Sequence, residues 1–200
     1  MSILLHVCCA PCLVFPASVM QGEGREFSCY FYNPNIHPYR EFRKRLDTFI
    51  EFAGSRGYSY IIDRDYGLKQ FLRQVVFNEE ARCGLCYRMR LGRTAKIAVE
   101  NGYSGFTSTL LYSTYQNHTL ICNQARQAAQ RQGVGFVYRD FRTGWQQGID
   151  ESISLGLYRQ SYCGCIFSEQ ERYDNRLKKQ LRILRKNDVQ SRGTSDDKPE

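Results

Sequence analysis

The sequence predicts an α/β fold with a mostly parallel sheet and helices on both faces. Short apolar segments of strand length alternate with amphipathic segments of helical periodicity, and this alternation continues through most of the chain. Parallel strands in such chains are joined by right-handed helical crossovers. The chain has 200 residues, 42% of them hydrophobic, which is enough for one sizeable core. We therefore predict a single domain over residues 1–186.

The first part of the chain supplies three predicted strands and two helices. Residues 3–7 form an apolar run of strand length, and a helix is expected at residues 13–20. Residues 27–32 combine aromatic and apolar side chains and predict the second strand. Apolar side chains recur at helical spacing over residues 42–53, with charged side chains largely off that face. A third short strand is expected at residues 58–62.

The same order repeats in the second part of the chain. Residues 68–76 mark another amphipathic helix, and a longer helix is expected from about residue 87 to residue 101. A strand is predicted at residues 105–110. Asn117 offers the N-cap of a further helix, and a last strand is predicted at residues 134–138.

The end of the chain is expected to be helical and then disordered. A helix is predicted after Asp140, reaching Ile153. Ser168 to Glu171 has the pattern of a capping box, and it opens a predicted helix that is rich in Lys and Arg as far as residue 186. Residues 187–200 contain almost no apolar side chains, so we expect a disordered tail there.

The charge and hydropathy of the chain indicate its partners and its compartment. A formal net charge of +8 favours an anionic partner, most often nucleic acid, although a solvated basic face is the simpler interpretation. No run approaches about 18 consecutive apolar residues, and the N-terminus lacks the basic segment of a signal peptide. We expect a cytoplasmic protein with no membrane partner.

Seven of the nine cysteines occur in three short clusters. These are Cys8, Cys9 and Cys12, then Cys83 and Cys86, then Cys163 and Cys165. In the cytoplasm thiols stay reduced, so clustered cysteines favour metal binding or redox catalysis. Each cluster is predicted to lie beside the start of a helix, where partial positive charge favours thiolate. The three clusters can therefore converge on one pocket at the carboxyl edge of the sheet.

Several kinds of chemistry fit these thiols. A structural zinc site needs four cysteines, whereas seven suit a four-thiolate iron-sulfur cluster with a second, incomplete metal site. Alternatively, Cys8 with Cys9, or Cys163 with Cys165, can form a thiol-disulfide couple. Two isolated cysteines are interpreted as buried small hydrophobic residues, and these are Cys29 and Cys122.

Histidines and loop aromatics offer further candidates. His6 lies in a strand pattern, and we interpret it as a core histidine rather than a ligand. His37 and His118 lie in loops near predicted strand ends, where substrate contact, proton transfer and loop packing are all open. Loop aromatics that can stack an extruded base are Tyr32, Tyr39, Tyr112, Tyr115, Trp145, Tyr158 and Tyr162.

Six motifs together resemble the cobalamin-independent family of epoxyqueuosine reductases. In chain order they are HVCCAPC, YFYNPNIHP, RCGLCYRMRL, FTSTLLYSTYQNH, DFR and YRQSYCGCIFS. The resemblance spans about residues 3–168. It implies an oxidoreductase of queuosine biosynthesis that reduces the epoxide of epoxyqueuosine at the tRNA wobble position. It also implies a fold similar to the adenine-nucleotide alpha hydrolases, but without their phosphate loop, so ATP use is not predicted.

The resemblance further implies a set of metal ligands, and with it we form a first hypothesis for the mechanism. It assigns a shared role in holding a 4Fe-4S cluster and a mononuclear iron to Cys8, Cys9, Cys83, Cys86, Cys163 and Cys165. Cys12 belongs to the first motif and counts as a further metal-binding thiol. The cluster delivers two electrons, one at a time, from an electron donor that the sequence does not identify. The iron polarises the epoxide oxygen, and Tyr162 or His118 donates a proton.

Two questions stay open at this point. Asp65 and Asp140 can supply a carboxylate ligand, although capping or surface roles are the favoured interpretation of both. Two other functions also fit the residues: a zinc-stabilised RNA-binding module, and a thiolate enzyme for tRNA modification or disulfide exchange.

Overall fold

The structure is a computed structural model that describes residues 2–176 and 178–179. The chain divides into two compact units, Met1–Arg159 and Gln160–Glu200. Among the described residues, no helix combines the length and the apolar character needed to cross a bilayer. The predicted single domain over residues 1–186 stays a prediction.

The first unit is built around a five-stranded, all-parallel sheet, which confirms the predicted α/β class. Its strands are β1 (Ile3–Val7), β2 (Phe27–Phe31), β3 (Tyr60–Ile62), β4 (Gly105–Ser108) and β5 (Gly135–Phe136). The order across the sheet is β3-β2-β1-β4-β5. The chain therefore reverses its direction of growth at β1, so that the carboxyl end of β1 lies at the topological switch point.

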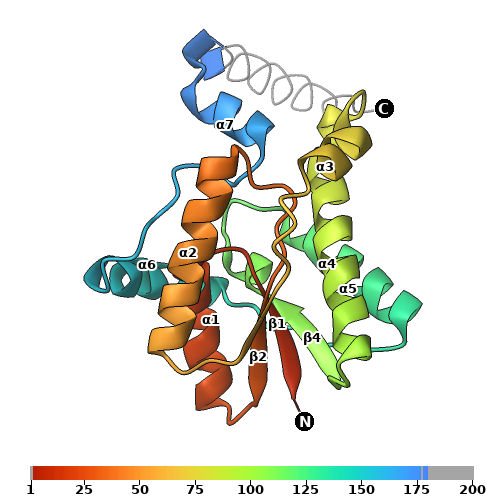
Figure 1. Ribbon diagram of the computed structural model, residues 1–200, viewed down its shortest axis with the longest axis vertical. Coiled ribbons are helices and arrows are strands. Elements are labelled where there is room, and N and C mark those ends of the chain that lie inside the picture. Colours follow the sequence, from red (N-terminus) through yellow and green to blue (C-terminus); the bar gives the residue numbers. More distant parts are fainter. Residues whose placement is uncertain (1, 177, 180–200) are drawn as a thin grey trace, which may run out of the picture. The chain divides into compact units, whose positions relative to one another are not determined.

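Helices cover both faces of this sheet. The helices of the first unit are α1 (Ala10–Gly22), α2 (Tyr39–Ser55), α3 (Leu68–Val75), α4 (Arg82–Glu100), α5 (His118–Gln132) and α6 (Trp145–Ser154). Figure 1 shows α1 and α2 on one side of the sheet and α4 and α5 on the other. Successive side chains of a strand point to opposite faces of the sheet. Leu4 of β1 therefore joins the core under α4 and α5, while Leu5 joins the core under α1 and α2.

Helix α4 starts five residues earlier than predicted. It begins at Arg82 after the 3-10 turn η1 (Glu79–Ala81), so Cys83 and Cys86 lie inside its first turns. The prediction that this cluster precedes the helix is therefore wrong. Cys86 and Arg90 share the buried face at helical spacing. We did not predict Arg90 on the buried face of α4 from the sequence, because an arginine is rarely a core residue.

The second unit begins differently from the prediction. Helix α7 (Ile166–Tyr173) has Cys165 as its N-cap, and the Cys165 Sγ accepts the Ser168 N–H at 3.4 Å. The predicted capping box at Ser168 is therefore wrong, because that residue already lies inside the helix. The predicted basic helix is interrupted at Asp174, and residues 175–176 and 178–179 are helical again. The remainder of that helix and the predicted tail at 187–200 lie outside the described residues.

Candidate metal centre

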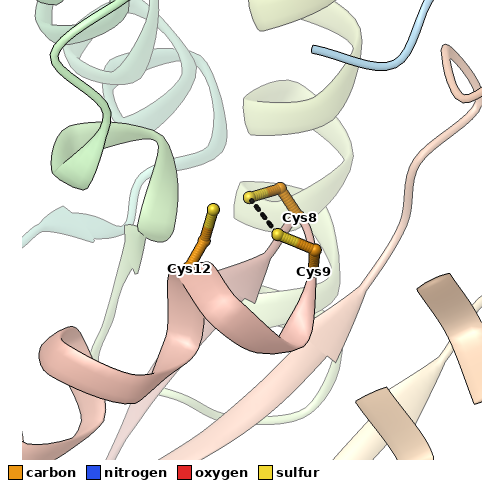
Figure 2. Close-up of side chains that lie close together, drawn as sticks. All are labelled: Cys8, Cys9 and Cys12. Atoms are coloured by element: carbon orange, nitrogen blue, oxygen red, sulfur yellow. Dashed lines mark hydrogen bonds between the residues drawn. The ribbon is translucent and has the colours of Figure 1, made fainter. Parts of the chain in front are cut away.

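Three cysteine sulfurs gather where β1 passes into α1. Cys9 is the N-cap of α1, and Cys12 lies in its first turn. The Sγ atoms of Cys8, Cys9 and Cys12 all lie within 4.8 Å of one another, and those of Cys8 and Cys9 are 3.7 Å apart. Figure 2 shows the three side chains pointing toward a common space at the start of the helix. The strand-to-helix turn alone is enough to bring these thiols together.

Cys8 is the thiol of this group that ionises most readily. Hydrogen bonds from Cys12 and then Cys9 hold the pKa of Cys8 well below its ordinary value, and the charge of Arg90 and the hydroxyl of Thr109 act in the same direction. Thr109 Oγ1 lies 3.3 Å from Cys8 Sγ and accepts the Cys8 backbone N–H at 3.1 Å. Burial raises the pKa of Cys9 to about 12.

Arg90 connects the second cysteine cluster to the first. Its side chain is almost completely buried, at 2% exposure. Its guanidinium donates to Asn33 Oδ1 at 2.7 Å, and another nitrogen lies 3.9 Å from Cys86 Sγ. The same charge lowers the pKa of Cys8. The guanidinium beside Cys86 Sγ is therefore the same one whose charge acts on Cys8.

His6 is a core histidine, as predicted from its strand pattern. The residue is fully buried, and its Nδ1 lies 2.8 Å from Ser108 Oγ. Its Nε2 lies 3.1 Å from the Tyr32 carbonyl oxygen and 3.3 Å from Arg90 Nε. Burial, followed by the charge of Arg90, lowers the pKa of His6 to about 3, so the ring is neutral at neutral pH.

The start of α4 packs against the start of α5. A Cβ added at Gly84 would meet Leu120 at 3.5 Å, so the turn that carries Cys83 lies close to the turn that carries His118. Cys83 itself is exposed. His118 is half-buried, and its Nε2 lies 3.2 Å from the Tyr138 hydroxyl. Burial, followed by the charge of Arg142, lowers the pKa of His118.

The other predicted site residues lie in the second unit. Cys163 is exposed, whereas Cys165 is buried as the N-cap of α7. The Tyr162 ring packs edge-on against Tyr173, with 6.3 Å between ring centroids. The convergence of Tyr162 and of these two thiols with the cysteines of the first unit stays a prediction.

Several of the remaining candidates have structural roles. Cys29 and Cys122 are buried, at 0% and 6% exposure, which confirms their interpretation as small hydrophobic residues. Asp65 caps a turn by accepting the Gly67 N–H at 3.0 Å. Asp140 binds Arg142 through both carboxylate oxygens, at 2.8 and 2.6 Å. His37 is buried against the ring of Phe71.

Sequence reasoning missed Thr109 and Arg90. Each lies within a motif that the resemblance singled out, yet neither residue type suggests a site when it is taken alone. The signal that was available is the helical spacing of Cys86, Arg90 and Thr94, which share the buried face of α4.

The donor set of the first unit suits a thiolate-bound metal centre. The three thiols of Cys8, Cys9 and Cys12 are soft ligands that already lie close together. The buried guanidinium of Arg90 compensates the negative charge of thiolates. Four thiolates are required for an iron-sulfur cluster, and Cys86 is a further candidate of this unit because it lies beside Arg90, whose charge also acts on Cys8.

Comparisons with known proteins find similar sequences over most of the chain. The model of the family described as epoxyqueuosine reductase QueH matches residues 3–171. The chain is 38% identical over 171 residues to the epoxyqueuosine reductase QueH of Dehalococcoides mccartyi, covering 86% of this chain and 94% of the relative. It is 34% identical over 184 residues to the QueH of Thermotoga maritima, covering 86% and 92%. The QueH of Histophilus somni is 35% identical, over 83% of this chain and 71% of the relative.

Proposed function

The chain belongs to the epoxyqueuosine reductase QueH family of oxidoreductases, and we propose that it reduces epoxyqueuosine in tRNA to queuosine with the help of a 4Fe-4S cluster and a mononuclear iron. The observation that carries this proposal is the buried group of Cys8, Cys9 and Cys12. A structural zinc site needs only four thiols, whereas the chain offers seven in clusters. When bound, the cluster supplies electrons and the iron supplies Lewis-acid polarisation of the epoxide oxygen.

The cysteines divide into two groups by their surroundings. The proposed ligands of the first group are Cys8, Cys9 and Cys12, whose sulfurs lie within 4.8 Å of one another, and Cys86, which lies beside Arg90. Cys83, Cys163 and Cys165 complete the proposed ligand set. Because Asp65 and Asp140 are engaged in turn and ion-pair contacts, these two carboxylates have to change partners before they can bind a metal.

Loss of the epoxide oxygen as water requires two electrons and two protons. We assign one proton donation to His118 or Tyr162. His118 is the candidate of the first unit, where α5 begins beside the turn that carries Cys83. The Tyr138 hydroxyl beside its Nε2 can orient the ring. Because the pKa of His118 is lowered, its cationic donor form becomes populated at a lower pH than that of an ordinary histidine.

The partners follow from the reaction and the charge. The substrate is a tRNA carrying epoxyqueuosine, and the net charge of +8 suits its phosphate backbone. A separate electron donor has to reduce the enzyme between turnovers. Cytoplasmic location agrees with a tRNA substrate and with the reduced thiols that the site requires.

The test is metal analysis of anaerobically purified protein combined with a turnover assay. We expect about five irons per chain, the sum of a four-iron cluster and one further iron, together with a paramagnetic signal from the reduced cluster. Cys12→Ser should lower the iron content and abolish reduction of epoxyqueuosine tRNA. Cys122→Ala is the matched control, because this buried thiol lies outside the clusters, and it should retain wild-type iron.

Two results would favour the alternative functions. Stoichiometric zinc, with steeply salt-dependent RNA binding and no turnover, would indicate an RNA-binding module. A persulfide or mixed disulfide trapped at Cys163 or Cys165 would indicate thiolate chemistry instead.

A further inference from the structure

Three aromatic rings lead from the thiol cluster to the protein surface. The rings of Tyr112 and Trp145 have centroids 4.9 Å apart, and those of Trp145 and Tyr115 are 5.5 Å apart. Exposure rises along this series, from 3% at Tyr112 to 87% at Tyr115. An almost fully exposed tyrosine ring is thus held edge-on against a tryptophan.

The inner end of this series lies beside the candidate metal centre. Phe15 and Cys12 are three residues apart on α1, and Phe15 stacks on the Tyr112 ring with centroids 6.2 Å apart. Burial, followed by negative charge on Cys12, raises the pKa of Tyr112. The aromatic series therefore starts in the immediate surroundings of the thiols and ends in solvent.

Helix α6 holds the tryptophan in a fixed position. A Cβ at Gly144 would lie 2.0 Å from the Phe15 ring, and a Cβ at Gly148 would lie 2.3 Å from Tyr112 Oη. Only glycine permits so close an approach of residues 144 and 148 to the Phe15 and Tyr112 side chains. In addition, Tyr112 Oη donates to the Trp145 carbonyl oxygen at 2.8 Å. The ring of Trp145 is consequently a rigid support for Tyr115.

We propose that Tyr115 and Trp145 form a stacking platform for an unpaired nucleobase of the RNA substrate. This inference rests on the proposed function. Aromatic rings stack on any base because every base presents a π-face, and the basic charge of the chain suits the attached phosphates.

The occupant of the platform is a base that neighbours the modified nucleoside. Tyr115 is separated from Tyr112 by Trp145. Because the Trp145 ring contacts both tyrosines, we assign the exposed Tyr115 ring to a neighbouring base and the inner Tyr112 end to the reacting nucleoside. The reacting nucleoside extends inward, and the platform holds the adjacent base of the same single-stranded loop.

Trp145 is the only tryptophan of the chain, and it provides the assay. An unmodified anticodon stem-loop, which contains no epoxide, is titrated into the metal-loaded enzyme while tryptophan fluorescence is recorded. We expect saturable quenching in the wild type. Tyr115→Ala should weaken stem-loop binding at least tenfold, or ~1.4 kcal/mol, whereas Tyr115→Phe should bind nearly as the wild type does. In turnover of the epoxyqueuosine stem-loop, the loss should appear in KM.

Tyr60→Ala is the matched control, because Tyr60 is a 40% exposed tyrosine on the edge strand β3. It should leave stem-loop affinity unchanged. The platform is overturned if Tyr115→Ala binds within twofold of the wild type, or if Tyr60→Ala loses as much affinity. The proposed function is tested separately, since its failure would show as no epoxide reduction by the wild type, whatever its affinity for RNA.

Discussion

Removing the buried charge of Arg90 should weaken metal retention more than it weakens the fold. The guanidinium lies 3.9 Å from Cys86 Sγ, and at that distance a thiolate and a cation attract by about 4 kcal/mol at an effective dielectric constant of about 20. We take this value as an upper limit because neighbouring charges screen part of it. In Arg90→Gln we therefore expect metal affinity to fall by about 1–4 kcal/mol, which is roughly tenfold to a thousandfold.

The fold is affected through a different contact. Arg90 donates to Asn33 Oδ1 at 2.7 Å, and loss of a charged donor to a buried acceptor costs about 1–3 kcal/mol. This cost falls on the apoprotein and the metal-loaded protein alike. Comparison of the two forms therefore separates the electrostatic effect on the metal centre from the structural effect on Asn33.

The assay is the rate of iron release to a ferrous chelator under anaerobic conditions, combined with urea unfolding of the apoprotein. Arg90→Lys is the matched variant, because it keeps the charge while losing the planar fork of donors. We expect it to hold iron better than Arg90→Gln, with a similar loss of apoprotein stability. Equal iron release from Arg90→Gln and the wild type would refute the role of this charge.

Three further predictions concern the surroundings of the site. Thr109→Val removes the acceptor of the Cys8 N–H and should lower the free energy of unfolding by about 1–3 kcal/mol. Thr109→Ser keeps the hydroxyl and is the control. Equal denaturation midpoints for the Thr109→Val and Thr109→Ser proteins would contradict this prediction. Because the pKa of His6 is lowered from 6.5 to about 3, the free energy of unfolding of the apoprotein should fall by about 1.4 kcal/mol per pH unit from this residue as the pH falls below 6.5. His6→Gln should flatten the urea-unfolding profile by that slope, and an unchanged slope would exclude it. Gly148→Ala should destabilise the protein by about 1–3 kcal/mol in thermal unfolding, because the added Cβ would meet Tyr112 and Phe15. Gly92→Ala meets no heavy atom within 4 Å and should stabilise the protein by up to about 1 kcal/mol. A change in stability of the same sign for both variants would argue against tight packing of α6 at Gly148.

The α/β class and most of its elements could be predicted from the sequence, because they depend on local patterns. β1 matches the predicted strand at residues 3–7, and the predicted N-cap Asn117 accepts the Leu120 N–H at 2.9 Å. Boundaries failed beside the cysteine clusters. Cys83 and Cys86 are predicted to precede a helix but lie in the first turns of α4, and before α7 a cysteine caps the helix in place of the expected serine.

The grouping of Cys8, Cys9 and Cys12 was determined by the sequence alone. A strand that ends at Val7 and a helix that begins at Ala10 bring thiols at these spacings together, whatever the rest of the chain does. The residues that tune these thiols were decided only by the tertiary structure. Thr109 reaches Cys8 across 101 positions of sequence, because β4 pairs with β1, and Arg90 reaches His6 across 84 positions, because α4 packs on the sheet. Long-range pairing and helix packing, rather than local pattern, select which polar side chains share a buried space with the metal-binding thiols.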